Sequence, residues 1–292
     1  MSKLVKFISL LLIIQLSANA KILDYKTTRL KSTGGAGVAS LLMDEATVLN
    51  PAPIAFFNMS SVYVEKSSTD NKDLEENNLK GSSNLAVIAS DSSKALKGSL
   101  SYVKTKKGDE NYKQLSTSFA STVGPKSSLG FTYQDIKRVD NYLGNIEKNE
   151  YSQVNIGVFH AVTSSLSLGM VAMDPFKSSE NGTKAILGMQ YQYGKFISLM
   201  LDAGADYTTE LSERSLVRGA IQFNVLSDFY IRAGMFDDKI DMQSGSGFGI
   251  SWIQPKLTLN FAMSNISVDE DALLKQIAEE IQETSFSLSY RF

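Results

Sequence analysis

The chain ends on Ser285-Phe286-Ser287-Leu288-Ser289-Tyr290-Arg291-Phe292, where apolar side chains at every second position alternate with small or polar ones. Alternation with a period of two is typical of a β-strand that has one apolar and one polar face. Chain termini are usually poorly ordered, and a soluble protein rarely places an aromatic residue at the very end of such a strand. The stretch therefore predicts a C-terminal strand with one apolar and one polar face.

The start of the chain has the pattern of an export signal. Lys3 and Lys6 precede an apolar run over 7–16, and Ala18-Asn19-Ala20 follows as a cleavage site. This pattern predicts a secretory signal peptide over residues 1–20. The apolar run is shorter than the roughly 20 residues that a membrane-spanning helix needs. Because no other stretch is long enough, a membrane-spanning part of this chain is expected to be a β-barrel.

The composition excludes several classes of protein. The chain has 29 basic and 31 acidic residues, a balance that gives no footprint for nucleic-acid binding. It contains no cysteine, which excludes disulfide frameworks, thiolate metal sites and cysteine nucleophiles. The mean hydropathy of -0.10 resembles that of a soluble protein. A barrel gives such a value as well, because its lipid-facing and lumen-facing residues alternate and average out.

From residue 61 onward, segments with period-two alternation are separated by turn-forming residues. We expect an all-β transmembrane barrel of about fourteen antiparallel strands over residues 61–292, and bacterial single-chain barrels have such an even number. The predicted strands are 61–67, 83–90, 97–105, 112–123, 128–137, 149–162, 166–174, 184–193, 196–206, 214–225, 228–236, 243–252, 256–266 and 284–292.

The connections between these strands alternate in length. Connections that follow even-numbered strands are mostly short, as at 124–127 and 163–165, whereas those that follow odd-numbered strands are longer and polar. The long connections are predicted over 68–82, 139–148, 175–183 and 267–283. Outer-membrane barrels have short periplasmic turns and longer extracellular loops. The pattern therefore places Phe292 at the periplasmic rim.

The alternation also predicts which side chains face the interior. A charge that faces lipid at the centre of a bilayer costs about 2–4 kcal/mol, so the polar positions should line the lumen. Asp202, Arg218 and Arg232 lie at such positions on three successive predicted strands. Strands about 4.8 Å apart allow these long side chains to meet. We predict a lumenal polar network that holds an inserted segment or binds an anionic head group, or that only stabilises the barrel interior.

Residues 21–60 do not alternate and contain three motifs. Gly34-Gly35-Ala36-Gly37-Val38-Ala39 is followed by Asp44-Glu45-Ala46-Thr47 and then by Asn50-Pro51-Ala52. Clustered small residues suit tight turns and close packing in a confined space. Pro51 lacks an amide donor and would end a helix that precedes it.

In order and spacing, these motifs resemble the outer-membrane long-chain fatty-acid transporter family, which includes aromatic-hydrocarbon uptake channels and is related to the shuttle barrel of type IX secretion. The resemblance implies a barrel whose lumen holds residues 21–60 as an N-terminal hatch. It implies a gating role for the hatch residues Gly34, Gly35, Gly37, Asn50, Pro51 and Ala52. Two features depart from the family: Pro53-Ile54 stands where Gly-Leu is common, and the short chain leaves small outer loops.

The last strand resembles the terminal signal of bacterial outer-membrane barrels, which the barrel assembly machinery reads. This resemblance implies that the machinery is a partner, and that the chain is located in the outer membrane of a Gram-negative-type bacterium, in contact with its lipid. The residues implied as the assembly signal are Phe286, Leu288, Tyr290 and Phe292.

One stretch within the barrel region has the pattern of a helix. Ser267 and Glu270 form a capping-box pair, and an apolar stripe follows at helical spacing. The residues of the stripe are Leu273, Leu274, Ile277, Ala278 and Ile281. The pattern predicts a helix over 268–282 in the last outer loop, where it acts as a lid or docking surface or only packs over the barrel mouth.

Nothing in the sequence suggests catalysis. The single histidine, His160, lies near a predicted periplasmic turn, and no activated nucleophile with an oriented base is recognisable. We therefore expect no enzyme activity, no cofactor and no metal. The resemblance implies passive uptake of hydrophobic small molecules, such as long-chain fatty acids. The alternatives are a barrel that anchors exported proteins without transport, and a structural barrel with no substrate.

Overall fold

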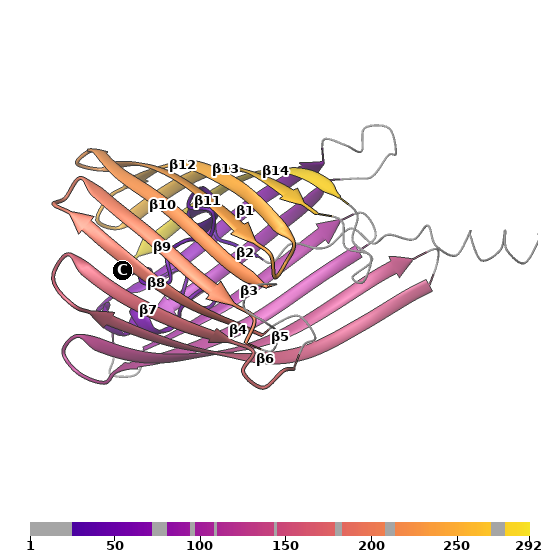
Figure 1. Cartoon of the computed structure of the whole chain (residues 1–292), viewed down its shortest axis with the longest axis horizontal. Coiled ribbons are helices and arrows are strands. Elements are labelled where there is room, and N and C mark those ends of the chain that lie inside the picture. Colours follow the sequence, from indigo (N-terminus) through magenta and orange to yellow (C-terminus); the bar gives the residue numbers. More distant parts are fainter. Residues whose placement is uncertain are drawn as a thin grey trace, which may run out of the picture.

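The computed structural model describes residues 25–71, 81–93, 97–107, 110–142, 145–178, 183–207, 214–269 and 278–292. These residues form a closed antiparallel barrel of fourteen strands, preceded by the short helices α2 (Thr28–Ser32) and η1 (Ala52–Phe56) (Figure 1). The strands are β1 (Ser60–Asn71), β2 (Ser82–Asp91), β3 (Lys97–Lys107), β4 (Glu110–Thr122), β5 (Ser127–Tyr142), β6 (Asn145–Ala161), β7 (Leu166–Met173), β8 (Lys184–Tyr193), β9 (Ile197–Ala205), β10 (Ser215–Leu226), β11 (Phe229–Asp238), β12 (Gln243–Ile253), β13 (Leu257–Val268) and β14 (Glu279–Arg291).

The predicted fold class is confirmed, because each strand pairs with its neighbours in sequence and the sheet closes on itself. The signal peptide predicted over 1–20 lies outside the described residues. In the described part of the chain, no helix has the length and apolar character that crossing a membrane requires.

The barrel closes where the first strand meets the last. β1 and β14 pair from Ser61 with Arg291 to Asn71 with Ile281. At the end of this seam, the amide of Phe292 donates to the carbonyl oxygen of Ser60 at 2.9 Å, and the amide of Ser60 donates back at 3.1 Å. Closure pairs the backbone groups that an open sheet would leave exposed at its edges. The C-terminal strand is therefore the element that completes the wall.

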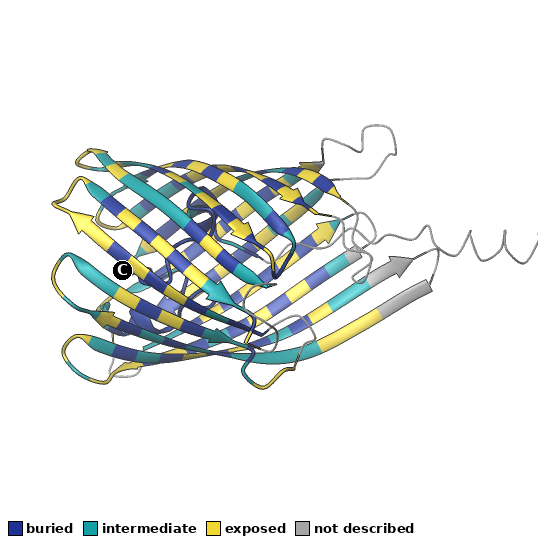
Figure 2. Cartoon of the chain, in the orientation of Figure 1, coloured by how far each residue is buried: buried dark blue, intermediate teal, exposed yellow. Residues whose placement is uncertain are grey.

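Buried and exposed residues alternate along the strands, as Figure 2 shows. In β14, Ser285, Ser287 and Ser289 face the interior and are almost completely buried. The outward residues in this part of β14 are Phe286, Leu288 and Tyr290, and Phe292 follows directly after the strand; these four residues of the predicted assembly signal are 38% to 67% exposed. The wall therefore has an apolar outer face and a largely polar inner face.

Residues 25–59, here called the inner segment, lie inside the barrel (Figure 1). Helix α2 packs against β11 to β14, and η1 packs against β3 to β6. Leu30 and Val38 join Val171 and Ile186 of the wall in a buried apolar cluster. The inner segment thus fills space that the closed wall leaves, over the region for which a hatch is predicted.

The long connection predicted over 139–148 is wrong. β5 continues to Tyr142 and β6 begins at Asn145, so that Val139 pairs with Lys148 in an extended hairpin. This part of the hairpin is mostly polar and has no apolar alternation, which is the signal by which a strand is recognised.

The helix predicted over 268–282 is wrong at both ends. β13 extends to Val268 and β14 begins at Glu279, and these two residues pair with each other. Ile281, a member of the predicted apolar stripe, packs instead in a buried cluster with side chains of β11 and β13. Strand pairing and this burial outweigh the local helical spacing. The middle of the predicted helix, residues 270–277, lies outside the described residues.

We expect a charge on the outer wall to destabilise the barrel in a bilayer. Leu201 on β9 is 53% exposed on the outer face. Leu201→Arg should lower the free energy of unfolding by about 2–4 kcal/mol, because the guanidinium loses its hydration in lipid. Phe196→Arg, in the turn between β8 and β9, is the control and should cost about 0–1 kcal/mol. Denaturant titration in liposomes measures both, and equal costs would contradict a lipid-facing wall.

Candidate functional site in the barrel interior

Glycines on the inner face of the wall allow the backbone of the inner segment to contact it directly. Three glycine pairs lie opposite each other on neighbouring strands: Gly130–Gly157, Gly169–Gly188 and Gly234–Gly247. A Cβ atom at Gly247 would overlap the carbonyl oxygen of Lys31, and one at Gly169 would overlap that of Val38. Glycine weakens the interior of a strand, but it permits another backbone to approach closely. The wall glycines therefore fix where the inner segment is seated.

The Asn50-Pro51-Ala52 motif lies against the Gly130–Gly157 pair. The side-chain amide of Asn50 donates to the carbonyl oxygens of Val38 at 2.8 Å and of Val158 at 3.1 Å. Its side-chain oxygen accepts from the amide two residues later at 3.0 Å. Asn50 thus connects its own turn, an earlier turn of the inner segment and strand β6.

The earlier turn, here called the Gly-rich turn (residues 34–38), is held by two charged side chains of the wall. Its glycines Gly34, Gly35 and Gly37 have φ values of 60°, 83° and 146°, a region that side-chain-bearing residues rarely adopt. Asp202 accepts from the amides of Gly37 at 2.8 Å and of Val38 at 3.2 Å. Arg218, opposite Asp202 on the neighbouring strand, donates to the carbonyl oxygen of Gly35 at 3.3 Å.

The polar network predicted for Asp202, Arg218 and Arg232 is divided in the structure. All three side chains are buried. Asp202 and Arg218 contact the Gly-rich turn, whereas Arg232 donates to the side-chain oxygen of Gln222 at 2.7 Å and to the hydroxyl of Ser251. The first two residues therefore hold the inserted segment, and the third bonds to its neighbours in the wall.

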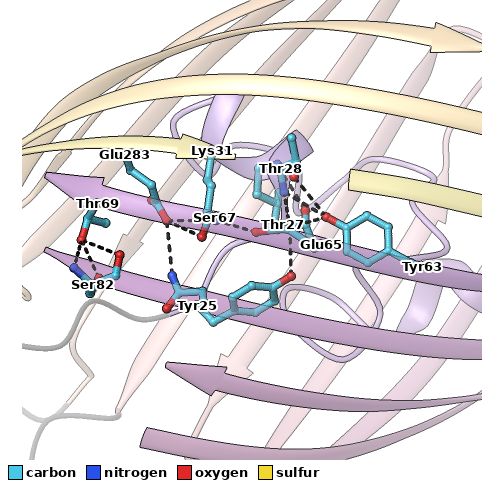
Figure 3. Close-up of polar contacts among 12 residues, drawn as sticks. Tyr25, Thr27, Thr28, Lys31, Tyr63, Glu65, Ser67, Thr69, Ser82 and Glu283 are labelled. Carbon is cyan, nitrogen blue, oxygen red and sulfur yellow. Dashed lines mark hydrogen bonds and ion pairs between the residues drawn. The ribbon is translucent and has the colours of Figure 1, made fainter. Parts of the chain in front are cut away.

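A buried ionic cluster joins the inner segment to the seam of the barrel (Figure 3). The ammonium group of Lys31 lies 2.5 Å from a carboxylate oxygen of Glu65 on β1 and 2.9 Å from one of Glu283 on β14. Glu65 also accepts from the amide of Thr28 at 2.7 Å and from the hydroxyl of Tyr25 at 3.0 Å. We call Lys31, Glu65 and Glu283 the seam cluster, because one lysine bridges the two strands that close the barrel.

Sequence reasoning did not find the seam cluster. The alternation in β1 could have placed Glu65 inside, because Val62 and Val64 are apolar and face outward. No comparable signal exists for Lys31, whose position depends on how a non-alternating segment folds within the lumen.

The acidic pair of the second motif also has structural partners. Asp44 accepts from the hydroxyl of Ser61 on β1 at 2.8 Å, and Glu45 accepts from the hydroxyl of Thr27 at 3.0 Å. Burial raises the pKa of the Glu45 carboxyl to about 7, although the nearby Arg29 guanidinium opposes the rise.

Two cavities near the inner segment share one lining residue. The inner cavity, of about 70 Å³, lies between the inner segment and the wall, and its apolar lining is Leu30, Val48, Leu49, Met173 and Ile266. The wall cavity, of about 300 Å³, is lined by residues of β12, β13 and β14 that include Gly245, Asn265, Ile266 and Glu280. Ile266 thus lies at the boundary between the two cavities.

Four of the charged groups that line the inner cavity are paired with one another, whereas Lys26 lies over the ring of Phe236. Lys184 contacts Asp241 and lies 4.0 Å from a carboxylate oxygen of Asp238. Arg218 lies 3.7 Å from the same carboxylate. These contacts offset the cationic charge that an anionic ligand would need. Among the described residues, no group of three or more His, Asp or Glu side chains is placed to hold a metal ion.

The fold, a closed barrel with an inserted N-terminal segment, is shared with known transporters. It resembles the Ralstonia pickettii toluene transporter TbuX with a TM-score of 0.67 at 10% identity, over 92% of this chain and 99% of that one. It resembles the Pseudomonas putida toluene transporter TodX with a TM-score of 0.66 at 9% identity, over 94% and 99% of the two chains. A Pseudomonas aeruginosa FadL homologue gives a TM-score of 0.62 at 12% identity, over 93% and 99%.

These likenesses establish the fold, and they confirm at that level the resemblance that the motifs of the inner segment imply. At the level of sequence, the chain matches no protein-family model and no curated protein.

We expect Gly247→Ala to disturb the contact between the inner segment and the wall. The added methyl group overlaps the backbone at Lys31, and such overpacking should cost about 1–3 kcal/mol of stability. Gly219→Ala on β10 is the matched control, because the nearest atom to its Cβ is 3.5 Å away. Urea unfolding and protease cleavage of the inner segment measure the effect. Equal stability and equal cleavage of the two variants would contradict close contact between the backbone of the inner segment and the wall glycines.

Removal of the bridging lysine should destabilise the closed barrel. Lys31→Met leaves two buried carboxylates without their cation, and the expected loss is about 3–5 kcal/mol. Lys137→Met is the control, since its partner Glu150 at 3.3 Å is half-exposed and the loss should be about 0–1 kcal/mol. Denaturant titration tests both, and Lys31→Met with Glu283→Gln should recover part of the loss. A loss for Lys31→Met no larger than for the control would refute the role of the seam cluster.

Proposed function

We propose that this protein is an outer-membrane channel for the passive uptake of hydrophobic small molecules. Three features support the proposal: the apolar outer face of a closed barrel, the inner segment seated across its lumen, and the two adjoining cavities. Solved structures with the same fold include proteins described as toluene transporters.

The position of Ile266 is the observation that carries the proposal. It faces inward from β13 and lines both the inner cavity and the wall cavity. Ile266 packs with Phe236, Val268 and Ile281, so that a small apolar cluster separates the cavities. A hydrophobic molecule could pass this cluster only if β13 also separated locally from a neighbouring strand, because paired strands about 4.8 Å apart leave no gap. Passage through the wall would then join the two cavities into one route.

The lining of the inner cavity supports an uncharged and compact substrate. Its apolar residues come from both the inner segment and the wall, and the cations Lys184 and Arg218 are paired with carboxylates. A volume of about 70 Å³ is less than the roughly 150 Å³ of a cavity that binds benzene, so the inner cavity must enlarge for a monoaromatic molecule and must enlarge more for an extended acyl chain. Apolar burial would drive uptake, at about 0.8 kcal/mol for each buried methylene. Long-chain fatty acids are therefore the less favoured substrate.

The inner segment would act as the hatch. It is anchored on one side at the seam cluster and on the other at the Gly130–Gly157 pair. Between them, the Gly-rich turn is held by hydrogen bonds to Asp202 and Arg218. We place the gating movement in residues 34–49, because a local shift there would enlarge the inner cavity while both ends stay anchored.

We expect Ile266→Trp to lower uptake severalfold, because the larger side chain narrows the boundary between the cavities. Phe261→Trp, on the outward face of β13, is the matched control and should leave uptake unchanged. The measurement is the influx of radiolabelled toluene, and in parallel of a labelled long-chain fatty acid, into liposomes that contain the purified barrel. Toluene influx no faster than in protein-free liposomes would overturn the proposed function.

One observation favours the alternative of an anchoring barrel. β6 begins at Asn145, but its pairing with β7 begins only at Asn155, so the first part of β6 pairs on one side alone among the described residues. An unpaired strand edge can receive a strand from another protein. If this alternative holds, replacement of 140–147 by a tight turn would abolish capture of a partner, and toluene influx through the unaltered barrel would not exceed that of protein-free liposomes.

A further inference from the structure

A group of lysines on the outer wall is not explained by transport. Lys104 on β3, Lys113 on β4 and Lys137 on β5 are directly opposite one another in the register of the sheet. All three face outward and are exposed, as is Lys106, two residues beyond Lys104 on the same face. Lys66 on β1 lies in the same row, separated from Lys104 only by Leu85 of β2. We call these five residues the lysine row.

The lysine row destabilises the barrel as long as its positive charges are not neutralised. Residues directly opposite on neighbouring strands have Cβ atoms roughly 4.5–5.5 Å apart, and like charges in this position repel each other. Lys137 has Glu150 at 3.3 Å as a partner, and Asp135 lies two residues from it on the same face. Among the described residues, no carboxylate forms an ion pair with Lys104, Lys106 or Lys113. An external anion would remove this repulsion.

The lysine row lies directly beside the apolar belt of the wall. Tyr102 and Leu115, which pair with each other and are 41% and 47% exposed, are the next outward residues below Lys104 and Lys113. On the other side of the row, β3 and β4 end at the connection 108–109, on the rim that carries the long connections. In an outer-membrane barrel this rim faces the cell exterior. The row is therefore at the depth of the lipid head groups of the outer leaflet.

We propose that the lysine row is a binding site for a glycolipid that carries more than one phosphate group, as the outer-leaflet lipid of Gram-negative bacteria does. The cations extend across five neighbouring strands, which matches several phosphates on one head group better than a single one. Basic clusters beside an apolar surface attract anionic lipid head groups. The acyl chains of the same molecule would cover the apolar belt at Tyr102 and Leu115. This inference rests on the outer-membrane location proposed above but not on transport.

The test compares purified barrels in non-ionic detergent with bis-phosphorylated lipid A and with the same lipid after removal of its phosphates. Native mass spectrometry gives the affinity, and thermal unfolding gives the stability. Lys104→Gln with Lys113→Gln should weaken binding of the phosphorylated lipid roughly 25-fold, at about fivefold for each lysine. Lys195→Gln with Lys256→Gln, two exposed lysines at the opposite rim, is the control and should bind like the unaltered protein.

The change in unfolding temperature caused by Lys113→Gln should have opposite signs without and with the lipid. This reversal distinguishes a lipid site from a merely structural role. Without lipid, Lys113→Gln should raise the unfolding temperature, because it removes the repulsion between lysines. With phosphorylated lipid A, the unaltered protein should be the more stable of the two. The proposal would be overturned if the phosphate-free lipid bound as tightly as the phosphorylated one. It would also be overturned if the double variant and its control lost the same affinity for the phosphorylated lipid. Toluene influx is not part of this assay, so a barrel that binds the lipid and fails to transport would contradict the proposed function alone.

Discussion

Closure of the sheet between β1 and β14 is the contact on which the rest of the structure depends. A β-sheet can be surrounded by lipid only when its edges are paired, so the wall must join its first strand to its last. Closure in turn creates an interior that has to be filled. Here Lys31 of the inner segment bonds to Glu65 of β1 and to Glu283 of β14. The element that fills the barrel therefore also holds its two ends together.

The inner face of the wall is adapted to this insertion in two ways. Glycines remove side chains where the backbone of the inner segment touches the wall, and Asp202 and Arg218 supply hydrogen bonds where the Gly-rich turn would otherwise bury unpaired backbone groups. Arg232 forms separate bonds within the wall. Among the described residues, the inner cavity and the wall cavity share Ile266 in their linings. In the proposed channel, passage would depend on local movement rather than on removal of the whole segment.

Much of the wall could be predicted from the sequence, because alternation is a local signal. It predicted the strand number and the inward positions of Asp202 and Arg218. It failed for 139–148, where the sequence has no apolar alternation, and at the ends of 268–282, where pairing overrides helical spacing. The seam cluster depends on the register between the two ends of the chain. Contacts of that kind have no local pattern, so the structure was needed to find them.

In the proposed gating mechanism, residues 34–49 move to admit a hydrophobic molecule while the ends of the inner segment stay fixed. Asp44→Cys with Ser61→Cys places two thiols where the native side chains touch at 2.8 Å, in a chain that has no other cysteine. Toluene influx into liposomes should be measured with the pair oxidised and then reduced. Influx should fall to the rate of protein-free liposomes in the disulfide form and should recover on reduction. Equal influx in both forms would show that the molecule passes without movement of this segment.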